Sequence, residues 1–267
     1  INVKILSSLL LLQTMREGRI KVHDYNIYYE IHGDGENVIL LLPGALGTIE
    51  TEMRKIIELF SQEADLTVVA VDPPGYGKSM PPLKDFANHY RKDCDIFHNF
   101  MQKLGFKTYS LFGFSDGGRV GLIMAAKYVN EIKKVAVWAT SAFITKSEKE
   151  YIKNILRDVS KWKQWKVAAL EKVYGSQLQE YWGKFIDAYC EYDDIFTNDL
   201  KFIKCPVFIL HGDKDPVIDK LHADYLAKNV TKAKVYHFPE GGHNIHDKYT
   251  EELCQLLITF VRENDCF

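Results

Sequence analysis

The sequence predicts an α/β protein with a mostly parallel central sheet and helices on both faces of that sheet. Apolar runs of strand length occur at residues 38–42, 66–71, 109–112, 132–138 and 206–210. Segments rich in helix-forming residues separate these runs, and alternation of strands with helices favours a parallel sheet. With 267 residues, 46% of them hydrophobic, the chain can bury one large core.

Further segments extend this pattern at both ends and interrupt it once. Residues 20–22 and 26–31 have the alternation of a first hairpin, and residues 234–238 predict a last strand before a C-terminal helix. An insertion at residues 140–204 is rich in helix formers and aromatics, and its position suits a lid over the active site. We expect most of its aromatic side chains to pack against the core and a few to line the pocket.

The N-terminal segment has two interpretations. Residues 5–12 are apolar but too short to span a bilayer, and no small-residue cleavage site follows them. Met15 is a candidate start, or the stretch up to Arg16, which lacks acidic residues, belongs to a mitochondrial presequence. We expect a mitochondrial or cytoplasmic protein without stable membrane insertion. The expected divisions are residues 1–18 as a leader or extension, 19–139 and 205–267 as the core, and 140–204 as the lid.

A serine flanked by glycines carries the clearest chemical signal. Residues 113–117 read Gly-Phe-Ser-Asp-Gly, between the strand-like residues 109–112 and the helix-like residues 119–128. This places Ser115 on a sharp strand-to-helix turn, the context of a nucleophile elbow. Small residues are needed on either side of such a turn, since larger side chains would collide with the adjoining strand or helix. Ser115 is therefore the candidate nucleophile.

A serine hydroxyl is a weak nucleophile at neutral pH, so a histidine must take its proton and a carboxylate must orient that histidine. Asp213 and Asp215 both emerge into a loop after the strand-like residues 206–210, and either is a candidate for the carboxylate.

His243 is the candidate base. It follows Gly241 and Gly242, which free the backbone to aim the imidazole at the site. The other histidines lack this glycine-rich approach. The nearest competitors along the sequence are His211, His237 and His246.

Together these features resemble the α/β-hydrolase family over residues 19–261. A narrower similarity, to the biphenyl-hydrolase-like group known as valacyclovir hydrolases, rests on four runs. They are Leu-Pro-Gly-Ala-Leu-Gly at 42–47, Gly-Phe-Ser-Asp-Gly-Gly at 113–118, Arg-Asp-Val-Ser-Lys-Trp at 157–162 and His-Ala-Asp at 222–224. The resemblance implies a serine hydrolase of α-amino acid esters that uses neither a metal nor an organic cofactor.

The resemblance also implies roles for individual residues. It favours Asp215 as the triad acid, which leaves Asp213 to bind loop amides. The negative charge of a tetrahedral intermediate requires two backbone donors. The amide of Asp116 is expected to supply one, and that of Ala45, or alternatively Leu46, the other.

Asp116 is unusual beside a nucleophile. A carboxylate next to a developing oxyanion repels it unless a positive charge compensates. The ammonium group of an aminoacyl ester would compensate, so we expect Asp116 to bind the substrate's α-amino group. The alternative is that Asp116 only stabilises the first turn of the following helix through the helix dipole.

Composition argues against other classes of function. The net charge is −2, without the basic stripe that nucleic-acid binding requires. The five cysteines are scattered, with neither metal-ligand spacing nor the density of a disulfide framework, which indicates a reducing compartment and no zinc. We expect a monomer whose partner is a small ester.

Two alternatives remain open, because this fold supports many functions. A carbon-carbon bond hydrolase of the biphenyl-degradation type, or a general carboxylesterase, would keep the same triad, although Asp116 would repel carboxylate-bearing substrates. A non-catalytic receptor would keep the triad and bind a small molecule. Repeated turnover would identify an enzyme, whereas a receptor would hydrolyse esters slowly.

Overall fold

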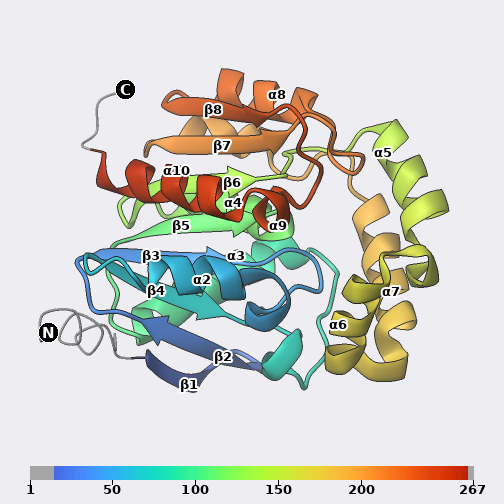
Figure 1. Cartoon of the computed structure of the whole chain (residues 1–267), viewed down its shortest axis with the longest axis horizontal. Coiled ribbons are helices and arrows are strands. Elements are labelled where there is room, and N and C mark those ends of the chain that lie inside the picture. Colours follow the sequence, from blue (N-terminus) through green and yellow to red (C-terminus); the bar gives the residue numbers. More distant parts are fainter. Residues whose placement is uncertain (1–14, 264–267) are drawn as a thin grey trace, which may run out of the picture.

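An eight-stranded sheet forms the centre of the molecule (Figure 1). The computed structural model describes residues 15–263. The strand order is β1-β2-β4-β3-β5-β6-β7-β8; β2 runs antiparallel to both of its neighbours, and all other adjacent strands are parallel. The predicted mostly parallel sheet is confirmed. The strands are β1 (Met15–Val22), β2 (Tyr25–His32), β3 (Asn37–Leu42), β4 (Leu66–Val71), β5 (Tyr109–Phe114), β6 (Ile132–Trp138), β7 (Val207–Gly212) and β8 (Ala233–Phe238).

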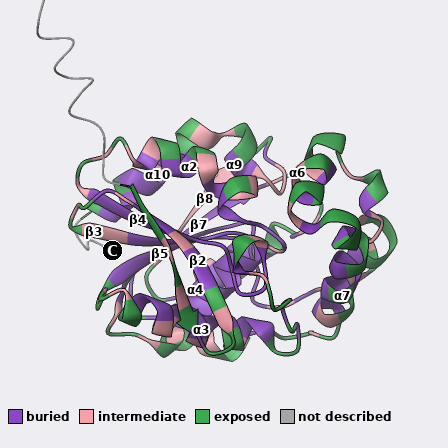
Figure 2. Ribbon diagram, turned by 90° about the horizontal axis from the view of Figure 1, so that it is seen from below, coloured by how far each residue is buried: buried purple, intermediate pink, exposed green. Residues whose placement is uncertain are grey.

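Helices cover both faces of the sheet (Figures 1 and 2). Leu40 and Leu42 of β3 pack into one core beneath the first group of helices, and Ile39 and Leu41 pack into a second core on the opposite face. Burial on both faces is what the continuous apolar runs predict. The first group is α3 (His89–Lys103), α4 (Asp116–Lys127) and α8 (Leu221–Asn229); the second is α2 (Arg54–Phe60), α9 (Ile245–Lys248) and α10 (Thr250–Arg262).

The strand before Ser115 ends later, and the helix after it begins earlier, than the sequence predicts. β5 reaches Phe114 and α4 begins at Asp116, so Ser115 alone separates them. Glycines lower the intrinsic preference for both strand and helix, which hides these boundaries in the sequence. β7 also continues two residues past its predicted end at 210, and β1 starts at Met15 because its whole length pairs with β2.

The predicted lid segment lies at the carboxyl ends of the parallel strands (Figure 1). Backbone hydrogen bonds join its two ends: the Ile144 amide donates to the Asp193 carbonyl at 2.9 Å, and the Ile195 amide donates to the Ala142 carbonyl at 3.0 Å. As predicted, most of its aromatics pack against the core: six of the twelve are buried, and Phe143, Tyr151, Trp162 and Tyr192 pack there partly buried, whereas Trp165 and Phe202 are exposed. The longer helices of the lid are α5 (Lys146–Tyr151), α6 (Gln164–Tyr174) and α7 (Leu178–Cys190). Short turns of other helix types occur in the lid at Ile152–Leu156, Val159–Lys161, Gly175–Gln177 and Thr197–Phe202, and outside it at Ile49–Met53 and Gly77–Ser79.

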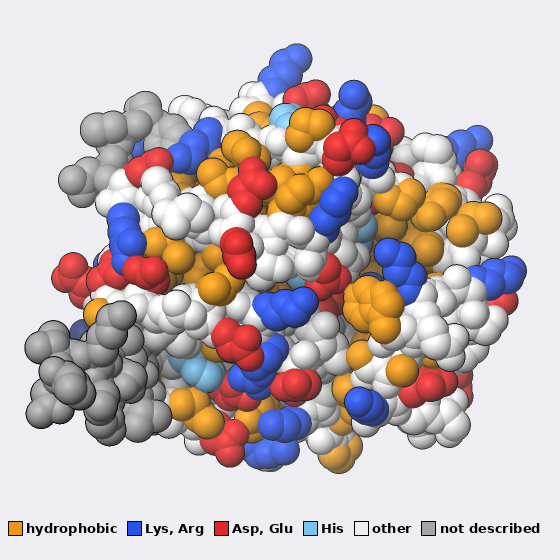
Figure 3. Space-filling model, in the orientation of Figure 1, with side chains coloured by type: hydrophobic (Ala, Val, Ile, Leu, Met, Phe, Trp, Pro, Cys, Tyr) orange, Lys and Arg blue, Asp and Glu red, His pale blue; other side chains and the backbone are white. Residues whose placement is uncertain are grey.

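Positive and negative side chains are interspersed on the face drawn in Figure 3. Cys94, Cys190, Cys205 and Cys254 are buried. Within residues 15–263 no cluster of three or more His, Cys, Asp or Glu side chains is placed to hold a metal, and no helix has the length and apolarity to cross a membrane. Residues 1–14, most of the predicted leader, and Cys266 lie outside the described residues.

Candidate active site

Ser115 occupies a strained turn that only its glycine neighbours permit. Its φ and ψ angles are 50° and −112°, outside the regions that residues with side chains ordinarily adopt. A Cβ atom at Gly113 would lie 2.5 Å from the Gly117 carbonyl oxygen, and one at Gly117 would lie 2.4 Å from the Leu42 carbonyl oxygen. The Thr140 hydroxyl donates to the Ser115 carbonyl oxygen at 2.9 Å, which holds the turn from the adjoining loop.

Asp215 and His243 meet at the carboxyl ends of the neighbouring strands β7 and β8. His243 Nδ1 lies 2.8 Å from Asp215 Oδ2. Asp215 Oδ1 accepts hydrogen bonds from the amides of Val217 and Ile218 at 2.8 and 3.1 Å. Burial alone would raise the pKa of Asp215, but the charge and hydrogen bond of His243 hold it below its ordinary value, so the carboxylate stays ionised.

The ring of His243 also lies beside the serine turn. Its centroid is 5.1 Å from that of Phe114, the residue that precedes Ser115. The structure therefore brings the serine, the histidine and one of the two candidate carboxylates to the same edge of the sheet, from three separate loops.

Asp213 takes a different partner. Its carboxylate lies 2.6 Å from His237 Nδ1, so the two acids of the loop after β7 each pair with a separate histidine. His237 is about one third exposed at its side chain and belongs to β8, not to the loop that carries His243.

The two remaining competitors are buried histidines. Burial lowers the pKa of both His211 and His246, to about 3 in His246. His246 Nδ1 accepts a hydrogen bond from the Trp138 indole at 3.2 Å, and its ring packs on Phe114 with centroids 4.3 Å apart. These contacts give His246 a packing role beneath the site.

Three backbone amides near the serine are free to bind an oxyanion. Within residues 15–263, those of Ala45 and Leu46 donate to no other group, and Asp116 opens α4, where amides lack a partner in the preceding turn. Their loop passes close to Ser115, since a Cβ at Gly44 would lie 3.3 Å from the Ser115 Cβ. Backbone donors placed in this way stabilise a tetrahedral intermediate.

Glu52 shapes this loop, although its role is not predictable from the sequence pattern. Its carboxylate accepts the Gly44 amide at 2.7 Å and fills the space beside Gly47, where a Cβ would lie 2.0 Å from Glu52 Oε2. No motif marks the residue, because the contact depends on how the helical turn after the loop folds back.

Asp116 is buried and already has polar partners inside the protein. Its Oδ1 accepts hydrogen bonds from the Tyr90 hydroxyl at 2.9 Å and from the Arg119 guanidinium, and His89 Nε2 lies 3.8 Å from its Oδ2. Burial alone would raise the pKa of Asp116, but His89 and Arg119 hold it below its ordinary value. Arg119, three residues further along the same helix, is therefore an internal positive charge beside Asp116, whereas the sequence pattern pointed only to the substrate for that charge.

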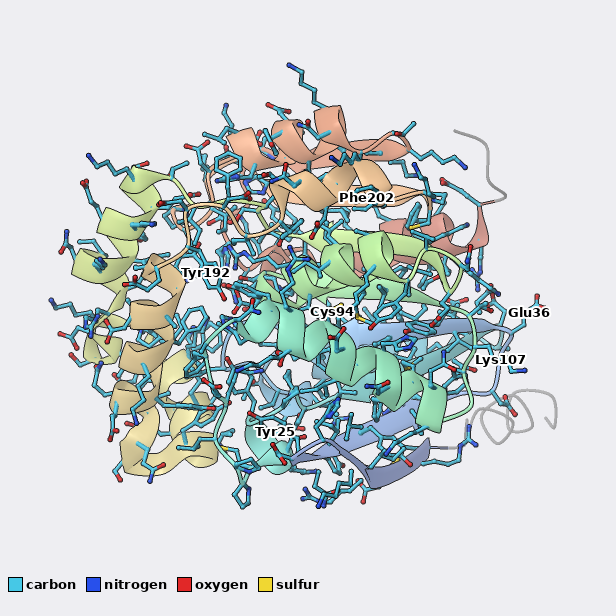
Figure 4. The ribbon with its side chains drawn as sticks, turned by 180° about the vertical axis from the view of Figure 1, so that it is seen from behind. Tyr25, Glu36, Cys94, Lys107, Tyr192 and Phe202 are labelled. Atoms are coloured by element: carbon cyan, nitrogen blue, oxygen red, sulfur yellow. The ribbon has the colours of Figure 1, made fainter. Side chains whose placement is uncertain are left out.

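Lid residues complete the surroundings of Asp116. Tyr192, labelled in Figure 4 just past α7, lies on the side of the lid that faces α3, and its ring centroid is 5.4 Å from that of Tyr90. The Tyr189 hydroxyl of α7 accepts a hydrogen bond from Arg119 at 3.2 Å. The lid therefore contacts the partners of Asp116 directly.

Comparison with known proteins identifies the family. A family model described as the alpha/beta hydrolase fold matches residues 37–166 and 153–248. The chain is 36% identical to the human (Homo sapiens) protein named serine hydrolase BPHL over 256 residues, which cover 93% of this chain and 87% of the relative. The mouse (Mus musculus) protein of the same name is 35% identical over 251 residues, covering 91% and 86%.

Two solved structures show the same fold at low sequence identity. A bacterial membrane phospholipase A has a TM-score of 0.81 at 20% identity, covering 98% of this chain and 92% of its own. The 2-hydroxy-6-oxo-6-phenylhexa-2,4-dienoate hydrolase of a Rhodococcus strain has a TM-score of 0.79 at 16% identity, covering 94% and 100%. The family match and the two mammalian relatives show that the chain belongs to the alpha/beta hydrolase fold family.

Proposed function

We propose that this α/β hydrolase is a serine esterase that cleaves carboxylic esters through an acyl-enzyme on Ser115. The observation that carries the proposal is the 2.8 Å contact between His243 Nδ1 and Asp215 Oδ2 beside the strained serine turn. With Nδ1 bound to the carboxylate, Nε2 of the imidazole is left to accept the serine proton.

The proposed reaction has two halves that use the same groups. His243 takes the proton of Ser115 as the serine oxygen attacks the ester carbonyl, and the amides of Asp116 and of Ala45 or Leu46 hold the oxyanion. The protonated His243 then gives its proton to the departing alcohol, which leaves an acyl group on Ser115. Water activated by His243 attacks this acyl group, the acid is released and the serine is regenerated.

We further propose α-amino acid esters as substrates, with Asp116 as the partner of the ammonium group. Three features support this. The sequence resembles the valacyclovir hydrolase group at the four runs given above. Asp116 Oδ2, unlike Oδ1, accepts no hydrogen bond from the residues that the structure describes, and His89 Nε2 lies 3.8 Å from it. Asp116 also lines a cavity of about 20 Å³, and a group the size of a water molecule or an ammonium fits such a volume.

The wall of this cavity is mainly apolar, but several polar side chains contribute to it and some of their atoms lack a partner. Tyr76, His89 and Asp116 all contribute to its wall. The Tyr76 hydroxyl and His89 Nε2 have no hydrogen-bond partner among the residues that the structure describes. Buried polar atoms of this kind are expected to meet a ligand or a water molecule.

Two measurements test the esterase. A fluorophosphonate should label the wild type at Ser115, and steady-state hydrolysis of p-nitrophenyl esters should fall by at least about 10³-fold in Ser115→Ala. Esters of valine with the amino group free or acetylated then report on the substrate class. Hydrolysis that survives in Ser115→Ala would refute the acyl-enzyme, and tight binding without turnover in the wild type would favour a receptor.

A further inference from the structure

We propose that Arg119 is a specificity-determining residue: a built-in counter-ion for Asp116 that lets the site accept neutral acyl groups as well as α-amino ones. The inference rests on the proposed esterase function. It concerns how strongly the enzyme discriminates between esters with a free amine and esters without one.

Arg119 is fixed in place from several elements at once. It is 1% exposed. Its Nη1 donates to Asp116 Oδ1, and its Nη2 donates to the Ser141 hydroxyl at 2.9 Å and the Tyr189 hydroxyl at 3.2 Å. The guanidinium carbon also lies 5.7 Å from the ring centroid of Tyr90 and 5.1 Å from that of Tyr189. A guanidinium held by so many contacts cannot swing away to leave Asp116 unpaired.

The charges near the cavity balance without a substrate. Arg119 pairs with Asp116, and Lys84 pairs with Asp93, whose side chain also lines the cavity. Both pairs are buried, and the remaining titratable groups that face Asp116 are the His89 imidazole and the tyrosine hydroxyls around it. Two carboxylates and two cations sum to zero, so an ammonium beside Asp116 gains from its local contact with the carboxylate and not from a net negative charge of these four groups.

This balance has a direct consequence for catalysis. An unpaired carboxylate one residue from the nucleophile would oppose the oxyanion whenever the substrate lacked a positive charge. With Arg119 in place that opposition is cancelled in advance, so neutral esters can react. A substrate ammonium would add a second cation to a carboxylate that already has one, and its advantage is therefore small.

Removal of the guanidinium should restore strong discrimination. In Arg119→Met, Asp116 loses its guanidinium partner and keeps only the His89 imidazole nearby, so the ammonium of a free-amine ester becomes an important source of compensating charge. The ratio of kcat/KM for free-amine over N-acetylated valine esters should be below about 10 in the wild type and should rise on the order of 100-fold in Arg119→Met. In Arg119→Met/Asp116→Asn both charges are absent, and the ratio should fall back toward that of the wild type.

The controls separate charge from folding. Lys127→Met removes a cation from the same helix, where it pairs with the half-exposed Asp95, and should leave the ratio unchanged. The double variant buries no lone charge, so it should fold even where Arg119→Met is unstable. Binding constants for the unhydrolysed esters in Ser115→Ala, with and without Arg119→Met, report the attraction between the ammonium group and Asp116 without any turnover.

The outcomes distinguish the two proposals. A ratio that stays constant in folded Arg119→Met, by kinetics and by binding, overturns the role of Arg119, as does a wild-type ratio already above about 100. Absence of hydrolysis in the wild type overturns the esterase instead, and the binding ratios in the Ser115→Ala background still decide the role of Arg119.

Discussion

Replacement of Glu148 should weaken the contact between the lid and the loop that carries Asp215, and so lower the stability of the protein. Glu148 lies in α5, is 5% exposed, and reaches across to the core. Its Oε1 accepts the Asp219 amide at 2.9 Å and lies 3.0 Å from His222 Nε2 of α8. Asp219 is four residues beyond Asp215, so one lid carboxylate holds the end of that loop.

The lowered pKa of Glu148 sets the size of the expected loss of unfolding free energy. Burial alone would raise this pKa, but His222 and the amides of Asp219 and Thr145 lower it to about 2, from an ordinary value of 4.5. A tenfold change in proton affinity corresponds to about 1.4 kcal/mol, so ionised Glu148 contributes at most about 3.4 kcal/mol. Glutamine keeps part of the hydrogen bonding, and we therefore expect Glu148→Gln to lower the free energy of unfolding by about 2 kcal/mol at pH 7.

The sign of the pH dependence follows from the lowered pKa. The contribution is complete above the unfolded pKa near 4.5, and it is lost as the pH falls toward the folded pKa of about 2. Urea unfolding of both proteins at pH 7, 4.5 and 3 measures this difference. Glu171→Gln, on the exposed part of α6, is the matched control and should change stability by less than about 0.5 kcal/mol. A Glu148→Gln effect no larger than the control's, or one that does not shrink in acid, would refute the reasoning.

Three further predictions concern the site and its support. Asp215→Asn should reduce kcat by about 10⁴-fold, whereas Asp213→Asn should change it less than about tenfold; equal losses in steady-state assays would contradict the assignment of the acid. Gly117→Ala should abolish folding or activity, because its Cβ would lie 2.4 Å from a carbonyl oxygen at the end of β3, while Gly121→Ala, whose Cβ would meet only an ordinary 3.8 Å contact, should be tolerated in thermal melts. Burial keeps His246 neutral with a pKa of about 3, so its contribution is complete above about pH 6.5 and is lost as the pH falls toward 3. Between pH 7 and 4.5 the wild type should lose about 2 to 3 kcal/mol more unfolding free energy than His246→Gln, and parallel losses would exclude this effect.

Local pattern was sufficient for the strands and for the serine turn. Apolar runs predicted β4 and β6 with the bounds that the structure has, because buried strands of a parallel sheet need apolar side chains on both faces. Where a strand ends near a glycine, as β5 ends near Gly113, the sequence predicted the strand too short. Glycine is required there because neighbouring backbone passes too close for a side chain, and not because glycine favours strands.

For the site, too, the sequence determined some features and the tertiary structure decided others. The sequence by itself determined that Ser115, two aspartates and a glycine-flanked histidine follow separate strands, since a motif records what one turn requires. Only the tertiary structure decided which acid pairs with His243, because Asp213 and Asp215 share a loop and differ in the direction each side chain takes. It likewise decided that Asp116 has an internal cation in Arg119, whose burial depends on Ser141 and Tyr189, residues distant in sequence. Charge balance at a buried site is a sum over neighbours in space, and a linear pattern does not contain that sum.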